Sequence, residues 1–342
     1  MVKTVVIQTA FLGDLLLTLP LIKALKLQDP EGEIHVLARG GCGEVLQSNP
    51  EVDAVMEYDK SGNGTGLNMG ASIAELRYRH FDRAVIPHKS LRSALIALLA
   101  EIPERVGFFS TLGYLMYSNS VEFPPTGHQV IRYLTLAGER GADVDRYPIV
   151  VYPSDDNYQK ADNLISEIMG GKAENIAAIA PGSVWATKRW LPEYYADLAS
   201  RLIKDFDYHV ILTGSRDDRD LCYDIGKLLP SSGWAITAGD FSIMDTAAIY
   251  ARSSFVVAND SAAGHLASAV STPVLTIYGP TVPAFGFYPV GKQNIIVEKK
   301  DLYCRPCSKH GPRECPEGHF RCMRELTTNT VLEHIDELLE NI

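Results

Sequence analysis

The segment with the most specific chemical pattern is ANDSAAGHLASAVSTPVLTIYGPT, which runs from Ala258 to Thr281. An apolar run ends there in an acidic residue, and small residues then open a helix. The first backbone N–H groups of such a helix, together with its dipole, form a site for an anion such as a phosphate. The residues predicted to line this site are Asp260, Ser261, Ala262, Gly264 and His265. The alternative is ordinary capping by Asp260 or Ser261, with small residues that serve packing.

A second segment, APGSVWATKRWLPE at Ala180–Glu193, offers hydroxyl groups and a cation after another apolar run. Its Pro-Gly pair makes a turn, Ser183 and Thr187 carry hydroxyls, and Lys188 carries a mobile ammonium. A lysine at the carboxyl end of a strand is well placed to neutralise a diphosphate. The alternative for Lys188 is a solvated side chain before a helix that begins at Pro192.

Two carboxylates follow other strand-like runs. Asp14 lies in QTAFLGDLLLTLP, where Gly13 permits a tight turn, and an acid in a first helical turn normally complements the helix dipole. This turn lacks the G-x-G-x-x-G pattern, which argues against dinucleotide binding there. Asp218 lies in LTGSRDDRD and can accept hydrogen bonds from ribose hydroxyls, although a solvated acidic helix start is the alternative.

Strand-like and helix-like runs alternate along nearly the whole chain and must position these residues. The first series has strands at Thr4–Gln8, Ile34–Ala38, Ala54–Tyr58 and Ala84–Pro87, and helices at Asp14–Lys26 and Leu91–Ala100. The second has strands at Ile176–Ile179, Val210–Thr213, Phe255–Ala258 and Val274–Tyr278, and helices at Pro192–Lys204, Asp218–Leu229 and Gly264–Val270. This alternation predicts an α/β fold of two doubly wound, parallel halves. We expect ligands at the carboxyl ends of the strands, in a cleft between the halves.

The length of 342 residues predicts about two domains. We expect them at residues 1–155 and 156–326, joined by a linker around Ile149–Asp156. A last amphipathic helix at 327–342 is expected to pack back on the first half. The Gly-rich run Ser61–Gly70 does not sit tightly between a strand and a helix, as a phosphate loop must, and is predicted to be a surface loop.

Composition narrows the class of protein. The chain is 46% hydrophobic and 22% charged, which is typical of a globular protein. It has no run of eighteen apolar residues that predicts a membrane-spanning helix, and its start does not resemble a signal peptide, so we expect a cytoplasmic protein. The net charge of −10 argues against nucleic acid as a partner.

Four of the six cysteines cluster near the C-terminus as C-x2-C-x7-C-x6-C, at Cys304, Cys307, Cys315 and Cys322. Their residue types, with His310 and His319 between them, suit a tetrahedral zinc site. Reduced, packed thiols and disulfides are the alternatives, and none of the three implies catalysis.

Taken together, the sequence resembles the ADP-heptose:lipopolysaccharide heptosyltransferases, glycosyltransferase family nine. FLGDLLLTLP, PGSVWATKRWLPE, LTGSRDDRD, NDSAAGHLASA and YGPT occur in that family's order and spacing, and the resemblance covers nearly the whole chain. The tail CRPC…CPEGHFRCM is similar to that of the heptosyltransferase II branch. The resemblance implies a GT-B fold, in which two Rossmann-like domains face each other across a cleft.

The resemblance also implies a function. It is that of an inverting, metal-independent glycosyltransferase with no required cofactor, which moves heptose from ADP-heptose to the lipopolysaccharide inner core. The first domain would bind the lipid-linked Kdo/heptose acceptor and the second the nucleotide-sugar donor. The protein would be cytoplasmic and in peripheral contact with the inner membrane. The alternatives are a family-nine transferase with another sugar or acceptor, and a non-catalytic nucleotide-binding module.

Individual roles follow from matching motifs. Asp14 falls on the family's proposed catalytic base, Lys188 on the lysine that contacts donor phosphate, and Asp218 on the carboxylate that holds the ribose. The positions that match the diphosphate loop are Asp260, Ser261, Ala262 and His265. The family often has Gly at Ala262, and Val184 replaces a hydroxyl residue, which leaves Ser183 to make that contact alone.

The acceptor side is expected to be basic, because an anionic sugar needs cations. Arg92 matches a basic position that faces the acceptor in the family, and Gly13 lies beside the expected base. Lys89, three residues before Arg92, is expected to share its helix face. The further candidates are His88, His128 and Arg132.

Overall fold

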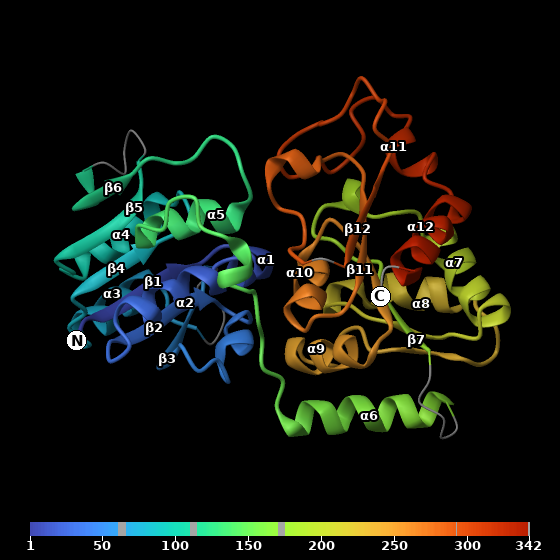
Figure 1. Ribbon diagram of the computed structural model, residues 1–342, viewed down its shortest axis with the longest axis horizontal. Coiled ribbons are helices and arrows are strands. Elements are labelled where there is room, and N and C mark those ends of the chain that lie inside the picture. The colour runs from blue at the N-terminus through green and yellow to red at the C-terminus, as the bar shows by residue number, and fades with distance from the viewer. Residues whose placement is uncertain (61–65, 110–114, 170–174, 292, 341–342) are drawn as a thin grey trace. The chain divides into compact units, whose positions relative to one another are not determined.

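The computed structural model describes residues 1–60, 66–109, 115–169, 175–291 and 293–340. Half of the Gly-rich run, 61–65, and the last two residues of the expected C-terminal helix lie outside these ranges. The chain divides into two compact units, Met1–Tyr152 and Pro153–Ile342. Each unit is a six-stranded parallel sheet covered by helices (Figure 1).

The first unit has the strand order β3-β2-β1-β4-β5-β6. The strands are β1 (Lys3–Gln8), β2 (Glu33–Arg39), β3 (Ala54–Tyr58), β4 (Arg83–Ile86), β5 (Glu104–Phe108) and β6 (Asn119–Val121). This is a doubly wound order, in which the winding reverses between β1 and β4 and leaves a crevice at their carboxyl ends. The central strand is fully buried at Val5, Val6 and Ile7, because both of its faces are covered by helices.

Helices of the first unit follow its strands. They are α1 (Leu12–Leu16), α2 (Leu19–Gln28), α3 (Met69–Tyr78), α4 (Leu91–Leu99) and α5 (Gln129–Leu134). The single helix expected at Asp14–Lys26 is wrong, since two helices occupy that stretch. Pro20 lies in the first turn of α2, where its missing N–H costs nothing, whereas in a continuous helix its ring would clash with the carbonyl of Leu16. The short helix α1 therefore carries Asp14 directly after β1.

The second unit repeats the same topology, with the order β12-β11-β10-β7-β8-β9. The strands are β7 (Ile176–Ala180), β8 (His209–Leu212), β9 (Trp234–Ile236), β10 (Phe255–Asn259), β11 (Val274–Tyr278) and β12 (Asn294–Glu298). Its winding reverses between β7 and β10, so the crevice predicted for a ligand lies where these two strands end.

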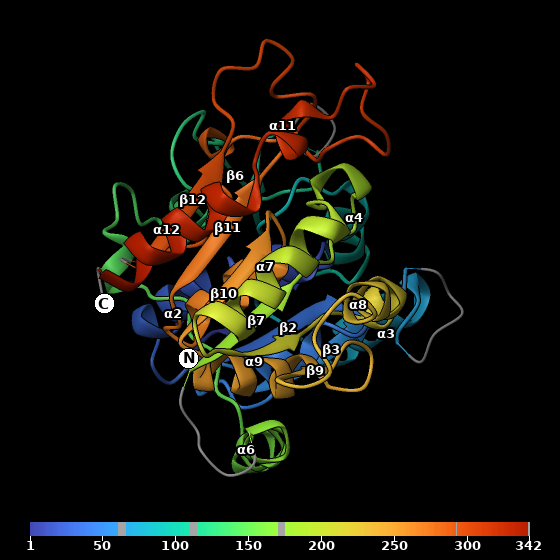
Figure 2. The same cartoon turned by 90° about the vertical axis from the view of Figure 1, so that its right-hand side faces the viewer.

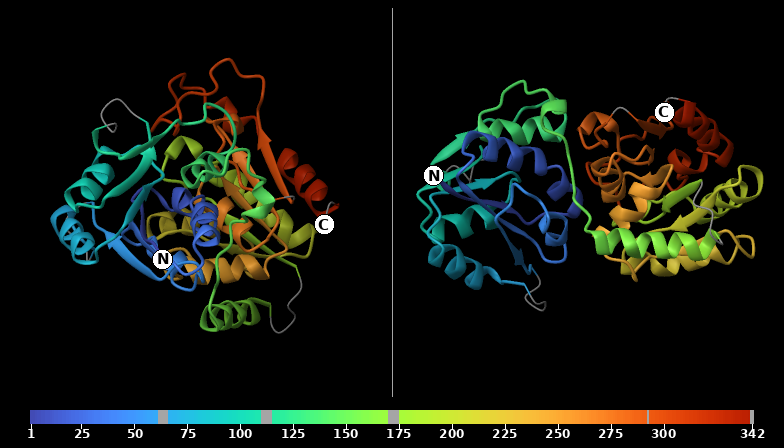
Figure 3. Two further views of the ribbon diagram at one scale, coloured as in Figure 1. Left: turned by 60° about the vertical axis from the view of Figure 1, so that its left-hand side comes forward. Right: turned by 60° about the horizontal axis from the view of Figure 1, so that its bottom comes forward.

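Seven α-helices are described in the second unit. They are α6 (Asp155–Met169), α7 (Pro192–Asp205), α8 (Arg219–Gly226), α9 (Ile243–Arg252), α10 (Ala262–Ala269), α11 (Arg321–Arg324) and α12 (Thr328–Glu340). Helix α6 begins where the linker was expected to end and packs along α9 (Figure 3). Lys160 of α6 forms an ion pair with Asp245 of α9 at 2.6 Å. In the described ranges, no helix has the length and apolar character needed to cross a bilayer.

The C-terminal helix α12 packs on α7, β11 and β12 of the second unit (Figure 2). Its buried residues Val331, Ile335 and Leu338 recur at helical spacing and join the hydrophobic core of that unit. The expectation that this helix packs on the first half is therefore wrong. Its amphipathic pattern predicts a buried face but does not say which surface covers it.

Candidate functional site

An ion pair stands at the carboxyl ends of β7 and β10, where the second sheet reverses its winding. Lys188 Nζ lies 2.6 Å from Asp260 Oδ2, and both side chains are nearly buried, with 12% and 11% exposed. Thr281 Oγ1 donates to the same carboxylate oxygen at 2.7 Å. The structure thus brings together Lys188 and Asp260, which the motifs place in one site. It adds Thr281, the last residue of the YGPT motif, to which the sequence assigned no role.

Asn259, another residue that the sequence analysis missed, holds this edge from behind. It is fully buried, and its Oδ1 accepts hydrogen bonds from the Trp190 N–H and the Tyr195 hydroxyl, both at 2.9 Å. Its Nδ2 donates to the carbonyl oxygen of Pro181 at 2.8 Å. Asn259 therefore ties the loop after β7 to the end of β10. The only sequence signal was an amide at the end of an apolar strand, where a polar group must find partners.

Helix α10 begins beside this ion pair. Its N-cap residue, Ser261, makes no side-chain capping hydrogen bond, so the capping alternative does not describe Ser261. Ser261 thus does not cap the first N–H groups of the helix, including that of Ala262, and the positive end of the helix dipole lies there. His265 is buried in the same turn. Gly264 serves packing, because a Cβ atom there would lie 2.9 Å from Cγ of Pro289.

Asp218 lies over the loop after β7 rather than in solvent, with 14% of its side chain exposed. Its Oδ2 accepts hydrogen bonds from the backbone N–H and the hydroxyl of Ser215, at 3.0 and 2.6 Å. Its Oδ1 lies 3.8 Å from an Arg189 nitrogen. Asp218 is thus a cap of the turn that precedes α8, and it also has one oxygen directed toward Arg189.

Two glycines make room for Asp218. A Cβ atom at Gly182 would lie 2.2 Å from Asp218 Cγ, and one at Gly214 would lie 2.8 Å from Asp218 Cβ. Gly182→Ala should therefore displace Asp218. If Asp218 holds a nucleotide ribose, as the sequence predicts, this change should weaken ADP binding by about tenfold or more, which corresponds to roughly 1.4 kcal/mol. Calorimetry would measure the affinity. Gly70→Ala, where the nearest atom is 3.6 Å away, is the control. An unchanged affinity in Gly182→Ala would contradict a role for Asp218 in nucleotide binding.

The two hydroxyl residues of the loop after β7 differ in their surroundings. Thr187 is buried, and its Oγ1 donates to the carbonyl oxygen of Pro312 at 2.5 Å. Ser183 is also buried, and its carbonyl oxygen accepts from Arg189 Nε at 2.8 Å. The hydroxyl of Thr187 is therefore already bonded to the cysteine-rich segment, residues 299–320. Sequence spacing does not predict this contact between distant parts of the chain.

In the first unit, Asp14 lies in α1 at the carboxyl end of β1 and is half-buried. The Tyr133 hydroxyl donates to Asp14 Oδ1 at 3.4 Å, and burial raises the pKa of Tyr133 well above its usual value, so the hydroxyl keeps its proton. Thr18 Oγ1 donates to the backbone carbonyl of Asp14 at 2.7 Å and in turn accepts from Gln8 Nε2 at 3.0 Å. These buried groups fix both the backbone and the carboxylate of Asp14. Gly13 precedes it within α1.

Three polar side chains meet at the carboxyl ends of β1 and β4, where the first sheet reverses. His88 Nε2 lies 3.3 Å from Thr9 Oγ1 and 3.1 Å from Ser93 Oγ, and the two hydroxyl oxygens are 3.2 Å apart. Burial lowers the pKa of His88 to about 4. The expectation that His88 supplies a cation is therefore wrong at neutral pH, because a desolvated imidazole loses its proton.

Acid should weaken the fold through His88. Its pKa is lowered to about 4 in the folded chain, below the value of about 6.5 for an unfolded one. The contribution of the neutral His88 ring to the free energy of unfolding is fully present above about pH 6.5. It is lost as the pH falls toward 4, by on the order of 3 kcal/mol. Urea unfolding at about pH 7.5 and about pH 5 should show a smaller loss of stability in His88→Asn than in the wild type. His80→Asn, at an exposed turn, is the control, and equal losses in the wild type and His88→Asn would contradict this assignment.

The remaining acceptor candidates fall into two groups. Lys89 Nζ lies 3.9 Å and the Arg132 guanidinium 5.1 Å from the centre of the Phe123 ring, so these two cations share one aromatic side chain. Arg92 is exposed in the first turn of α4. Lys89 precedes the N-cap of α4, so the expected common helix face with Arg92 is wrong. His128 caps α5, where its Nδ1 accepts from the Val130 N–H at 3.2 Å.

All six cysteines are free thiols within the part of the chain that the structure describes. Cys322 is packed in the core of the second unit, and burial raises its pKa to about 11, while burial also raises the pKa of Cys307. Cys304 Sγ lies 3.9 Å from His319 Nε2, and Cys315 Sγ accepts from the Phe320 N–H. Among the described side chains, no group of three or more His, Cys, Asp or Glu is arranged to hold a metal ion.

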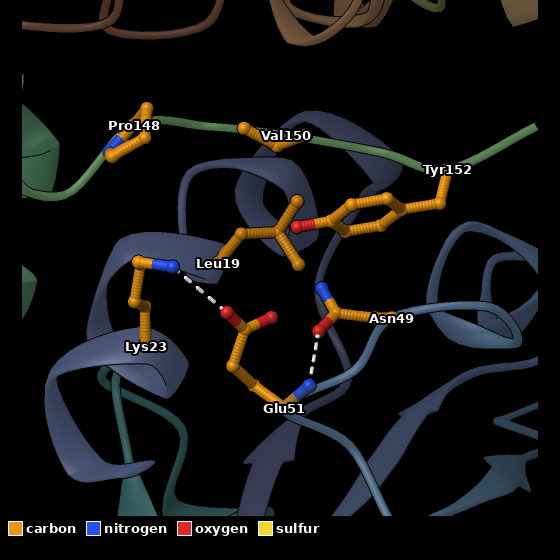
Figure 4. Close-up of a pocket in the computed structure, with 7 residues that line it drawn as sticks. All are labelled: Leu19, Lys23, Asn49, Glu51, Pro148, Val150 and Tyr152. Atoms are coloured by element: carbon orange, nitrogen blue, oxygen red, sulfur yellow. Dashed lines mark hydrogen bonds and ion pairs between the residues drawn. The ribbon is translucent and has the colours of Figure 1, made fainter. Parts of the chain in front are cut away.

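A small hollow in the first unit lies apart from these residues (Figure 4). Its lining comes from Leu19, Lys23, Asn49, Glu51, Pro148, Val150 and Tyr152. Lys23 Nζ pairs with Glu51 Oε1 at 2.9 Å, and this hydrogen bond raises the pKa of Lys23. Asn49 and Glu51 precede β3, whereas ligands of doubly wound sheets bind where strands end. The hollow therefore marks where the last segment of the first unit rests on α2.

Comparison with known proteins agrees with this arrangement. Residues 69–318 match the model of glycosyltransferase family 9 (heptosyltransferase). The chain is 29% identical to lipooligosaccharide heptosyltransferase 2 of Haemophilus influenzae, with 98% of each chain covered. It is 27% identical to lipopolysaccharide heptosyltransferase 2 of Salmonella typhimurium, also with 98% of each chain covered.

Solved structures give the same result. The ADP-heptose lipopolysaccharide heptosyltransferase II of Escherichia coli superposes with a TM-score of 0.79 at 25% identity, over 98% of each chain. A family 9 glycosyltransferase of Veillonella parvula superposes with a TM-score of 0.86 at 19% identity, over 99% of this chain and 98% of that one, and shows the shared fold. The predicted α/β, GT-B fold class is confirmed by these neighbours. Because the family model matches residues 69–318, which are most of the chain, the chain belongs to glycosyltransferase family 9, the heptosyltransferases.

Proposed function

We propose that this protein transfers heptose from ADP-heptose to the lipopolysaccharide inner core, with inversion at the anomeric carbon. The observation that carries the proposal is the nearly buried Lys188–Asp260 pair beside the start of α10, where Ser261 makes no capping hydrogen bond, at the switch point of a sheet in a family 9 chain. A nearly buried cation next to the first backbone N–H groups of a helix is suited to a diphosphate. The names of the relatives support heptose as the sugar and the lipopolysaccharide core as the acceptor.

In this proposal the second unit, Pro153–Ile342, binds the donor. Lys188 and the first N–H groups of α10 hold the diphosphate, with Ser183 and Thr187 in the adjacent loop. Asp218 accepts hydrogen bonds from the ribose, and His265 lies in the first turn of α10 behind the phosphates. As the glycosidic bond breaks, negative charge grows on ADP, and a fixed cation with oriented dipoles stabilises that charge. The diphosphate charge is thereby met by protein groups, and we propose that no metal is needed.

The first unit, Met1–Tyr152, binds the acceptor and supplies the base. Asp14 removes the proton from the attacking acceptor hydroxyl, because a neutral hydroxyl is a weak nucleophile toward the anomeric carbon. The anomeric carbon passes through an oxocarbenium-like state, and attack opposite the departing ADP inverts its configuration. The exposed cations Lys89 and Arg92 meet the anionic Kdo sugars of the acceptor.

The lipid-linked acceptor places the reaction at the cytoplasmic face of the inner membrane. We propose that the protein works there by peripheral contact, since an acceptor with a lipid anchor stays at the bilayer while the sugar enters the site.

The proposal is tested by following ADP release from ADP-heptose with and without a Kdo-lipid acceptor. We expect release to require the acceptor, and to proceed at the same rate with and without a chelator of divalent metals. Binding of ADP without any turnover on defined core acceptors would contradict the enzymatic function. Turnover with another nucleotide sugar alone would keep the transferase and change the substrate.

A further inference from the structure

The cysteine-rich segment, residues 299–320, connects β12 to α11 (Figure 1). It forms hydrogen bonds with the loops that we propose bind the donor. We propose that part of this segment, Arg305–Pro312, is a positioning element of the donor site, which fixes Thr187 and Lys188 against the Gly279–Thr281 loop. The inference rests on the proposed function, because it takes Lys188 as a ligand of the donor diphosphate.

The first set of contacts is to the loop after β7. The Pro312 carbonyl oxygen accepts the Thr187 hydroxyl at 2.5 Å. The ring of His310 stacks on Trp185, with 6.1 Å between ring centres and 20° between planes. Three consecutive residues, His310 to Pro312, thus pack along the stretch from Trp185 to Lys188. They determine where the ammonium of Lys188 can lie.

Gly311 makes the closest approach. Its φ of +83° lies in the left-handed region that favours glycine. A Cβ atom there would lie 3.2 Å from both Lys188 Cγ and Thr187 Oγ1, and 3.3 Å from Pro280 Cγ. These distances are tighter than ordinary van der Waals contact, so a methyl group would push against the lysine stem from the side of the segment.

The second set of contacts is to the loop after β11. Arg305 is almost fully buried, with 2% of its side chain exposed, and it forms an ion pair with Glu298 at 2.8 Å. Its Nε donates to the Gly279 carbonyl at 2.5 Å and its Nη2 to the Thr281 carbonyl at 2.7 Å. The Cys307 N–H donates to the Pro280 carbonyl at 2.9 Å. One planar guanidinium thus holds both ends of the Gly279–Thr281 loop.

The two sets of contacts meet at Asp260. Thr281, whose carbonyl Arg305 holds, donates its hydroxyl to Asp260 Oδ2, and the same oxygen accepts Lys188. The segment therefore fixes Lys188 and the hydrogen-bond partner of its counter-ion at once. A displacement of either loop would move the Lys188 ammonium away from the place where it meets the diphosphate. Electrostatic stabilisation of a leaving group depends on such fixed geometry.

Two glycines of the same segment provide a matched test. Gly311→Ala and Gly318→Ala place the same methyl group on left-handed residues, with φ of +83° and +69°, but nothing lies within 4 Å of the Cβ position at Gly318. Calorimetric titration of the full-length protein with ADP should show affinity at least about tenfold weaker in Gly311→Ala. Gly318→Ala should bind ADP as the wild type does. Turnover should show a higher KM for ADP-heptose and an unchanged KM for the acceptor in Gly311→Ala.

Arg305→Lys is the second variant, because it keeps the charge beside Glu298 but cannot reach the carbonyl groups of Gly279, Thr281 and Lys299 and a carboxylate with one planar group. It should also weaken ADP binding while the far-ultraviolet circular dichroism stays that of the wild type. If Gly311→Ala and Arg305→Lys both bind ADP as tightly as the wild type, the inference is overturned and the proposed function stands. If the wild type itself fails to bind ADP, the proposed donor site is wrong and the inference fails with it.

Discussion

Replacing Asp14 with asparagine should lower kcat by roughly 10²–10⁴-fold and leave the affinity for ADP-heptose nearly unchanged. The amide has the shape of the carboxylate and can still accept the Tyr133 hydroxyl, so the local structure of α1 should persist. It cannot take a proton from the acceptor hydroxyl. The loss therefore falls on the chemical step, which steady-state kinetics with a Kdo-lipid acceptor would measure beside calorimetry with the donor.

A matched control is available in the same unit. Glu44 is also a half-buried acid in the first turn of a short helix, residues Gly43–Leu46. Glu44→Gln removes a carboxylate of that kind far from β1 in the sequence, and should keep the wild-type kcat. Should Asp14→Asn retain full activity, Asp14 would be a partner of the α1 dipole and no more.

Replacing Lys188 with methionine should lower kcat/KM for ADP-heptose by roughly 10²–10³-fold and weaken ADP binding. The substitution keeps the length of the apolar stem and removes the ammonium. It also leaves Asp260 nearly buried without its cation, and a carboxylate in that state repels the incoming diphosphate. Both effects act on the leaving group, so donor kinetics and ADP titration should change together.

The chain contains another Lys–Asp ion pair with the same nitrogen–oxygen distance for comparison. Lys160 lies 2.6 Å from Asp245, between α6 and α9 of the same unit. Lys160→Met controls for loss of a lysine and its ion pair, and should bind ADP normally. The role assigned to Lys188 would be contradicted by equal ADP affinities in Lys188→Met and the wild type, with both proteins folded.

Much of the candidate site was predictable, because parallel strands bring their carboxyl ends to one edge. Lys188 follows β7 and Asp260 follows β10, and a doubly wound sheet places these two strands side by side. Sequence order alone therefore predicts that the two residues approach each other. The same reasoning places Asp14 after β1, at the switch point of the first sheet.

The residues that were missed are those whose partners are distant in sequence. Arg305 acts through carbonyl groups of the Gly279–Thr281 loop, and backbone carbonyls leave no mark on a motif. Gly182 is small because Asp218 fills the space above it, a contact between the loops after two strands. His88 was taken for a cation because its residue type allows one, and only its burial shows that the ring is neutral.

The most direct test of the account is the mass and anomeric configuration of the product formed from ADP-heptose and a defined Kdo-lipid acceptor. We expect an acceptor heavier by one heptose residue, joined with the anomeric configuration opposite to that of the donor, and one ADP released for each transfer. An unmodified acceptor in the presence of folded protein that binds ADP would contradict it.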